Sequence, residues 1–317
     1  MTTVLDPPRT VPADDLTRRE VVIGAIGIAL AAAGCGGDGA ADADDPGRTR
    51  TIRHKLGTTD VPARAERVVA LDANELEECV ALGLTPVGSI PDPLPHLPPS
   101  AADIPPALTS AYEVRVERIA ALRPDLIVGP DFYVEELYDR LSAIAPTVVT
   151  PRDTFADWKE NLRFMGRTLG REEEARAVLA DYDARARTAR AAIDAPSVGP
   201  VTAMLAFEDR MYVYVRSFCN TVLADAGLRP PGAQVRALPE GEERLDLSLE
   251  RIPILEARHI FLGRLADFPS PISDNPLFRR LPAVRSGRVH EVEGQTWNQG
   301  SVIAANAILD DVEEALA

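Results

Sequence analysis

The sequence contains few of the residues that most often build metal and redox sites. It has 3 cysteines and 4 histidines in 317 residues. A site for a free metal ion needs about three converging His and carboxylate ligands, so four scattered histidines argue against one. His259 and His290 fall within strand patterns and should be structural, whereas His96, in a proline-rich loop, could touch a ligand. Cys79 and Cys219 lie in different halves of the chain, and we expect two buried free thiols rather than a disulfide.

Lysine is nearly absent. It occurs only at Lys55 and Lys159, so arginine supplies almost all of the 34 basic residues. We attribute this abundance to a composition bias, and a single arginine therefore indicates a site only when its position supports it. Acidic residues number 49, and the net charge is −15. Phosphate repels an anion of that size, which argues against a nucleic-acid partner.

Catalytic signatures are absent as well. The sequence has neither a G-x-S-x-G nucleophile elbow nor a G-x-G-x-x-G phosphate loop in its strand–turn–helix units. The similar stretch GAIGIALAAAG belongs to an apolar N-terminal segment. An exported enzyme, for example a hydrolase, is thus the weaker alternative to a binding protein, and a turnover assay would separate the two.

The apolar run near the N-terminus is too short to span a bilayer comfortably. It covers residues 21–33, which makes 13 apolar or small residues, the length of a signal-peptide core. The pair Arg18 and Arg19 before it resembles a twin-arginine export signal. The small residues that precede Cys35 resemble the end of a lipoprotein signal, with Ala32 in place of the usual leucine.

We therefore predict a lipoprotein signal over residues 1–34, cut before Cys35, whose sulfur would carry a diacylglycerol. Residues 35–50 are rich in Gly, Ala and Asp without periodicity, which indicates a flexible tether. The mature protein would then be exported and anchored to the outer face of the cytoplasmic membrane without spanning it.

The rest of the chain alternates strand and helix patterns. Residues 67–71 are apolar and β-branched, residues 75–82 have helical spacing, and residues 86–88 return to an extended pattern, which together predict a βαβ unit. The proline-rich stretch 91–106 is predicted to hold no regular element. Residues 133–145 predict one further helix.

One phrase occurs twice. VERIAALRPDLIV, at residues 116–128, and LERIPILEARHIF, at residues 249–261, share Glu-Arg-Ile in a row and a later Leu and Ile in step. Each predicts a helix followed by a buried parallel strand; in the first copy the helix covers residues 116–122, Pro124 stops it, and the strand covers residues 125–128. Chance similarity is the alternative to a true repeat. Because residues 171–193 predict one long helix between the copies, we expect an α/β fold of two similar lobes joined by that helix. The predicted boundaries are 51–153 for the N-terminal lobe, 154–196 for the helical bridge and 197–317 for the C-terminal lobe.

Six segments in order carry a family likeness, namely residues 65–88, 116–129, 140–149, the long helix after 165–170, 249–263 and 281–316. Together they resemble the substrate-binding proteins of ABC importers for ferric siderophores, haem and cobalamin. The resemblance implies two Rossmann-like lobes bridged by a rigid helix, with a ligand cleft between them and only small closure. It also implies a monomer without enzymatic activity or cofactor, which carries a ferric siderophore to an ABC permease dimer.

In that family, a glutamate on each repeated helix pairs with arginines of the permease. The matching positions in this sequence are Glu117 and Glu250. One glutamate on each lobe suits a two-fold permease dimer, because charged pairs at a rim set register and association rate. Alternatively, each glutamate only stabilises the start of its own helix.

The ligand cleft is expected beyond the carboxyl ends of the strands. The segments there offer aromatic walls and arginine donors, namely Phe132, Tyr133, Arg216, Arg264 and Trp297. Each of these could instead belong to the core, but Trp297 falls in a predicted Gln/Gly/Asn-rich loop, where a core residue is less expected. The other tryptophan, Trp158, belongs to the predicted helical bridge and should be packed. Relatives that take triscatecholate siderophores carry an arginine just after the first-lobe strand, where this chain has PDFY. The resemblance thus favours a hydroxamate or mixed chelate, with haem or cobalamin as the alternatives.

Overall fold

The computed structural model describes residues 48–316, apart from 92–93, 95, 98, 110–112, 152–153 and 266–269. The predicted signal and Cys35 lie outside the described residues, and so does most of the predicted tether. The last two residues of that tether, Thr49 and Arg50, are the first residues of a strand. None of the described helices is both long and apolar enough to cross a membrane.

The N-terminal lobe contains a small sheet whose three parallel strands are fully buried, in the order β3-β4-β5. Apolar runs of this kind are typical of parallel strands that are covered on both faces. A separate antiparallel hairpin, β1-β2, precedes the sheet. Asp72 caps the start of helix α1, and its carboxylate accepts the N–H of Asn74 at 3.2 Å. The elements are β1 (Thr49–His54), β2 (Gly57–Pro62), β3 (Val68–Ala70), α1 (Ala73–Ala81), α2 (Val116–Leu122), β4 (Leu126–Gly129), α3 (Asp131–Val134), α4 (Tyr138–Ser142) and β5 (Thr147–Val149).

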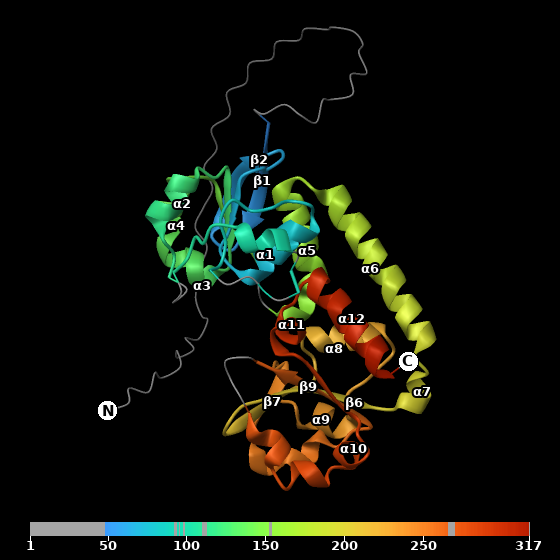
Figure 1. Cartoon of the computed structure of the whole chain (residues 1–317). Coiled ribbons are helices and arrows are strands. Elements are labelled where there is room, and N and C mark those ends of the chain that lie inside the picture. The colour runs from blue at the N-terminus through green and yellow to red at the C-terminus, as the bar shows by residue number, and fades with distance from the viewer. Residues whose placement is uncertain are drawn as a thin grey trace, which may run out of the picture. The chain divides into compact units, whose positions relative to one another are not determined.

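Two helices follow the N-terminal lobe, α5 (Trp158–Leu169) and α6 (Glu172–Ala192). Gly170 ends α5 with a left-handed backbone (φ 76°), which glycine adopts at little cost. Helix α6 has 21 residues, or about 30 Å at 1.5 Å per residue, with glutamates in its first turn as the helix dipole favours. It packs against α5 and against two helices of the C-terminal lobe, α8 (Phe218–Asp225) and α12 (Val302–Leu316), and so bridges the lobes (Figure 1).

The C-terminal lobe is built on a five-stranded mixed sheet in the order β10-β9-β6-β7-β8. Strands β6, β9 and β10 are parallel, while β7 and β8 add antiparallel strands on one side. Strand β6 is buried along its whole length, and the edge strand β8 is largely exposed. The remaining elements are α7 (Ala195–Val198), β6 (Val201–Ala206), β7 (Arg210–Tyr214), α9 (Gly232–Ala237), β8 (Arg244–Ser248), β9 (His259–Arg264), α10 (Pro282–Arg285), β10 (Val289–Glu293) and α11 (Gly294–Asn298).

Both copies of the repeated phrase form a helical segment followed by a buried parallel strand, as predicted. The first copy is α2 followed by β4, and the second is a 3₁₀ helix, Leu249–Leu255, followed by β9. Ile119 and Ile252, at matching positions, are both fully buried. Pro253 accounts for the difference between the two helices, because proline lacks the N–H that an α-helix needs.

Two local predictions are wrong. The proline-rich stretch holds a short 3₁₀ helix, Pro99–Asp103. The helix predicted over residues 133–145 is broken into α3, a 3₁₀ turn (Glu135–Leu137) and α4. The backbone of Leu137 has a ψ of 4°, outside the helical range, and this interrupts the helix.

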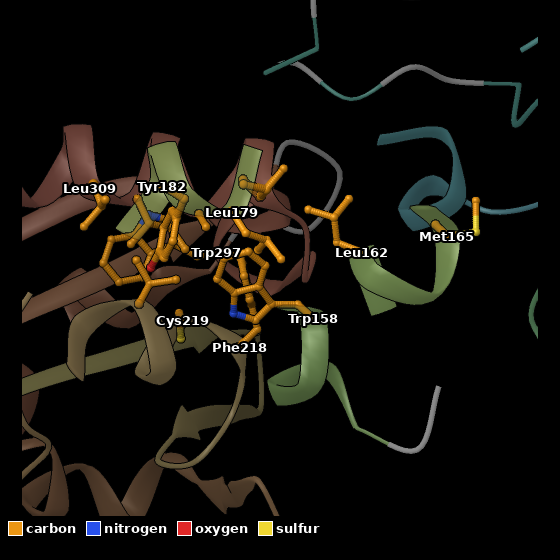
Figure 2. Packing of buried hydrophobic residues seen from close by; sticks show 14 of the residues in the cluster. Trp158, Leu162, Met165, Leu179, Tyr182, Phe218, Cys219, Trp297 and Leu309 are labelled. Carbon is orange, nitrogen blue, oxygen red and sulfur yellow. The ribbon is translucent and has the colours of Figure 1, made fainter. Parts of the chain in front are cut away.

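One hydrophobic core runs through both lobes and the bridge. Trp158, on α5, is 1% exposed, and its ring meets those of Tyr182 and Phe218 edge-on, with centroids 4.8 and 6.0 Å apart (Figure 2). Its Nε1 donates to Thr221 Oγ1 at 3.0 Å. The same cluster includes buried residues of α1 in the N-terminal lobe and of α12 in the C-terminal lobe. The prediction that Trp158 is packed is therefore confirmed.

Cys79 and Cys219 are buried free thiols, as predicted. Burial raises the pKa of both thiols, that of Cys219 to about 12. Since the thiolate is the reactive form, neither cysteine is suited to redox or nucleophilic chemistry.

Candidate ligand-binding site

A cavity of about 880 Å³ lies at the carboxyl ends of β6, β9 and β10. Small-molecule sites occupy roughly 300–1,000 Å³, and open α/β sheets bind ligands at this end of their strands. Strands β7 and β8 and helices α11 and α12 complete the wall. Among the described residues, the wall comes entirely from the C-terminal lobe, between Leu205 and Asp311.

Strand β7 brings two tyrosines to the cavity, because residues two apart on a strand share one face. The rings of Tyr212 and Phe207 have centroids 4.8 Å apart, and the Arg244 guanidinium lies 4.1 Å over the Tyr212 ring. Tyr214 is 2% exposed, and its hydroxyl has no hydrogen-bond partner in the described part of the chain. Burial raises the pKa of Tyr214 well above its usual value, so the hydroxyl stays protonated. A ligand oxygen could therefore accept a hydrogen bond from it.

The wall carries charges of both signs, with Arg244 and Arg264 facing three carboxylates. Arg264 pairs with Glu291 and also donates to Ser273 Oγ at 3.1 Å. Its side chain is one-third exposed, so the guanidinium keeps access to the cavity. The arrangement can bind ligand oxygens without giving the wall a net positive charge.

The other two carboxylates of the wall, Glu293 and Asp311, are held by protein donors. Glu293 caps α11, and its Oε2 accepts the backbone N–H of Thr296 at 2.7 Å. Asp311 accepts Trp297 Nε1 at 2.7 Å, and burial raises the pKa of this carboxyl group. Both groups thus fix the position of α11 as well as lining the cavity.

Of the predicted ligand residues, Arg264 belongs to this wall, and Trp297 bonds to the wall residue Asp311. Arg264 lines the cavity directly. Trp297 belongs to α11, but its indole is 2% exposed and stacks on Phe261, with centroids 4.8 Å apart. The expectation that Trp297 lies in an open loop is wrong, because Glu293 caps a helix that turns the indole towards the core.

The other predicted ligand residues do not line this wall. Arg216 is exposed just beyond β7. Phe132 and Tyr133 lie on α3, which follows β4 in the N-terminal lobe, and their rings contact each other with centroids 4.5 Å apart. Phe132 is 61% exposed. Ligand contact by these three side chains stays a prediction.

The two glutamates predicted to dock the permease are both exposed. Each lies in the first turn of its helical segment, Glu117 in α2 and Glu250 in the 3₁₀ helix Leu249–Leu255. Glu117 pairs with Arg140 at 3.2 Å, and both side chains remain largely exposed. An exposed pair of this kind is weak and could exchange partners.

The histidines have partners within the protein. His259 Nδ1 lies 3.0 Å from His290 Nε2, and burial lowers the pKa of both rings, that of His259 to about 4. His96 is 9% exposed and contacts Glu77 and Thr296, so it lies in a buried network rather than at an open rim. Within the described ranges, no three His, Cys, Asp or Glu side chains converge to hold a metal ion.

Sequence reasoning missed most of the cavity wall. Phe207, Tyr212, Tyr214, Arg244 and Asp311 were not among the expected ligand residues. The alternation of the two tyrosines in MYVYV was the available signal, since it places both rings on one face of a strand.

Comparison with known proteins agrees with this architecture. Residues 68–296 match the family described as periplasmic binding protein. The chain is 32% identical over 286 residues to the probable siderophore-binding lipoprotein YfiY of Bacillus subtilis (strain 168), covering 84% of this chain and 87% of that protein. It is 29% identical to the achromobactin-binding periplasmic protein of Dickeya dadantii (strain 3937), covering 78% and 85%. Staphylococcus aureus SirA complexed with staphyloferrin B superimposes with a TM-score of 0.73 at 26% identity, over 84% of this chain and 98% of that one.

Proposed function

The chain belongs to the periplasmic binding protein family, and on that premise we propose that it is the substrate-binding component of an ABC importer. It captures a ferric siderophore outside the cytoplasm and delivers it to the membrane permease. The similarity to siderophore-binding relatives supports this assignment. The observation that carries it is the cavity of about 880 Å³, whose wall combines Tyr212 and Tyr214 with the guanidinium groups of Arg244 and Arg264.

In this proposal, some side chains of the wall donate hydrogen bonds and others make apolar contacts. Arg244, Arg264 and Tyr214 donate hydrogen bonds to the oxygens of the chelate. Tyr212 and Phe207 offer flat apolar surfaces to its organic part. Trp297 supports the wall from behind through its bond to Asp311.

The N-terminal lobe and the outer edge supply the remaining contacts of the proposal. Phe132 and Tyr133 follow the carboxyl end of β4 and would cover the chelate from the N-terminal lobe. Arg216 would contribute a charge at the outer edge of the site. These contacts are secondary in the proposal, because no wall residue of the cavity is among them.

A neutral or weakly charged chelate suits the cavity better than a strongly anionic one. Three carboxylates face two guanidinium groups, and one of those guanidinium groups is already paired with Glu291. A ferric trishydroxamate carries little charge, whereas a ferric triscatecholate is strongly anionic. The proposal therefore favours a hydroxamate or mixed chelate, and haem or cobalamin is the alternative occupant.

Tryptophan fluorescence tests this function directly. Titration with a ferric trishydroxamate should dim the emission saturably and at lower concentration than titration with a ferric triscatecholate. Trp297→Phe should remove much of the quenching, since Trp297 lies directly behind the wall. The proposal fails if hydroxamate, mixed and catecholate chelates, haem and cobalamin all give no saturable change. Mass spectrometry of ligand that co-purifies from iron-starved cells would identify the compound.

Anchoring and docking complete the proposal. We place the lipid on Cys35 and the permease contacts on Glu117 and Glu250, with the protein acting as a monomer. Loss of the protein from the membrane fraction on Cys35→Ala would support the anchor, and unchanged membrane association would refute it.

A further inference from the structure

A chain of buried hydrogen bonds joins the N-terminal lobe to the cavity wall. It begins at Glu77, on α1, whose side chain is fully buried. Glu77 Oε1 lies 3.0 Å from Nε2 of His96, and Nδ1 of the same ring lies 2.9 Å from Thr296 Oγ1. Thr296 Oγ1 in turn donates to Glu293 Oε2 at 2.7 Å, and Glu293 lines the cavity.

A second set of bonds holds the same two regions together. Ser301 Oγ, at the start of α12, donates to Glu77 Oε2. Gln299 Nε2 donates to Asn74 Oδ1 at 2.6 Å, and Gln299 also lines the cavity. The α11–α12 corner is therefore fixed to α1 of the N-terminal lobe by side chains that are almost all buried.

Hydrogen counting along the chain indicates how many protons the Glu77–His96 pair holds. Glu293 is a carboxylate and can only accept, so the single hydrogen of the Thr296 hydroxyl points to it. His96 Nδ1 must then carry a hydrogen in order to donate to Thr296 Oγ1. On the other side of the ring, Nε2 faces Glu77 Oε1, and a bond there requires another hydrogen between the two atoms. The Glu77–His96 pair thus holds one proton more than a carboxylate beside a neutral imidazole.

Loss of that proton would rearrange the chain. A neutral imidazole carries one hydrogen. If it stays on Nδ1, the lone pair of Nε2 faces the Glu77 carboxylate at 3.0 Å, and two acceptors oppose each other. If it moves to Nε2, Thr296 must turn its hydrogen from Glu293 to His96, and Glu293 loses a donor. In both cases one bond of the chain is lost.

The surroundings favour retention of the proton. Two carboxylates lie near the pair: Asp72, ahead of α1, acts electrostatically on Glu77, and Glu293, the last residue of β10, accepts from Thr296 beside His96. In the part of the chain that the structure describes, neither Glu77 nor His96 has a Lys or Arg ion-pair partner. Burial raises the pKa of Glu77, which acts in the same direction.

We propose that His96 is a positioning residue for ligand binding: the proton it shares with Glu77 holds α11 and Glu293 in the arrangement that receives the siderophore. This inference rests on the proposed function of the cavity. It makes ligand affinity depend on the protonation of a pair that touches no ligand.

The first experiment needs no ligand. Nitrogen-15 histidine NMR of the full chain at neutral pH should show a hydrogen on Nδ1 of His96, assigned by its loss in His96→Gln. A pH series of the same spectra should show where the Glu77–His96 pair loses its shared proton. An unprotonated Nδ1 at neutral pH would overturn the inference.

The second experiment measures affinity for a ferric trishydroxamate across the same pH range. The wild-type affinity should fall about five-fold or more as pH rises through the midpoint seen by NMR. His96→Gln should bind more weakly at neutral pH and lose this pH dependence. The matched control is His54→Gln, because His54 bonds Thr59 in the β1-β2 hairpin and should keep the wild-type profile.

Thr296→Val is a second test, which is needed if His96→Gln fails to fold. It removes only the hydroxyl link and keeps the side-chain shape. It should flatten the pH profile in the same way. If the wild-type affinity does not vary with pH, or if both variants keep the wild-type profile, the inference is overturned while the proposed function stands. If the probe binds at no pH, the proposed ligand class fails and the coupling fails with it.

Discussion

The two lobes contain the same repeated phrase but contribute unequally to the candidate site. The N-terminal lobe has a sheet of three parallel strands, whereas the C-terminal lobe adds antiparallel β7 and β8 to its parallel strands. Tyr212, Tyr214 and Arg244 come from these two added strands, and every described residue of the cavity wall belongs to the C-terminal lobe. The repeated unit therefore supplies the frame, while strands outside the repeat supply the groups that face a ligand.

The repeat itself also differs between the lobes. Leu126 begins β4 and is fully buried, whereas His259, at the matching position, begins β9 and pairs with His290. The helix before β4 is an α-helix, and the one before β9 is a 3₁₀ helix that contains Pro253. This position of the repeat therefore keeps neither its burial nor its chemistry, whereas the matching pair Ile119 and Ile252 keeps both.

The largest expected effect concerns what the lobes share. Trp158→Ala should lower the free energy of unfolding by about 3–5 kcal/mol, because it opens a cavity in the core that links both lobes to the bridge. Chemical denaturation should still show one transition for both lobes, monitored by circular dichroism and by Trp297 fluorescence. Two separated transitions in the wild-type protein would show that the lobes unfold independently and would contradict the shared core.

The next effect tests whether the C-terminal wall dominates binding. Arg264→Ala should lower the affinity for the ferric chelate by about ten- to a hundred-fold, equivalent to about 1.5–3 kcal/mol, because it removes a charge-assisted donor. Arg216→Ala is the matched control, and we expect it to weaken binding by less than about five-fold, because that side chain is exposed. If calorimetric titrations show equal losses of affinity in the two variants, the ligand binds further out, near Arg216.

A smaller effect tests whether the lobes act as equals towards the permease. Glu117→Ala and Glu250→Ala should each lower siderophore uptake by up to about five-fold, as exposed ion pairs contribute little individually. The double variant should lower uptake further, while its ligand affinity stays at the wild-type value. Uptake assays in cells that lack the native protein would measure this. Normal uptake by the double variant would remove the docking role from both residues.

The smallest effect concerns the histidine pair that only the C-terminal lobe carries. Burial lowers the pKa of His259 to about 4 in the folded protein, below its unfolded value of about 6.5. The unfolded state therefore binds more protons between these values, so stability is present above pH 6.5 and is lost as pH falls towards 4. Since both rings are partly exposed, the loss should stay below about 1 kcal/mol.

Thermal unfolding at a series of pH values would check this prediction. The unfolding temperature of the double variant His259→Gln/His290→Gln should fall less than that of the wild-type protein as the pH is lowered from 6.5 to 4. An unchanged pH dependence in the double variant would assign the acid sensitivity to other groups, the carboxylates first.

Much of the fold could be predicted from local patterns. Helix α2 begins and ends where the sequence pattern placed it, because the pattern of apolar residues and the proline two residues after its end mark a helix directly. The break inside residues 133–145 could not be predicted, since the apolar spacing continues across it. The 3₁₀ form of the second repeat helix was indicated by Pro253 but was not read as such.

The site was harder to predict because its residues meet only in three dimensions. His96 contacts Thr296, which is 200 positions away along the chain, and no local pattern encodes such a contact. Trp297 looked like a loop residue because its neighbours are polar, but those neighbours line the cavity while the indole faces the core. Arg264 was found because the carboxyl end of a strand is a position that sequence can locate.

The continuous core around Trp158 has a consequence for how the chelate is released. Two halves that share one packed interior have little freedom to swing apart, so the empty protein already presents most of its wall and spends little binding energy on rearrangement. Because the bound form then stores little strain, the protein itself does not drive release of the chelate. On the proposed function, the permease must then drive release. The residence time of the chelate is set by the transporter, which separates the lobes, rather than by spontaneous opening.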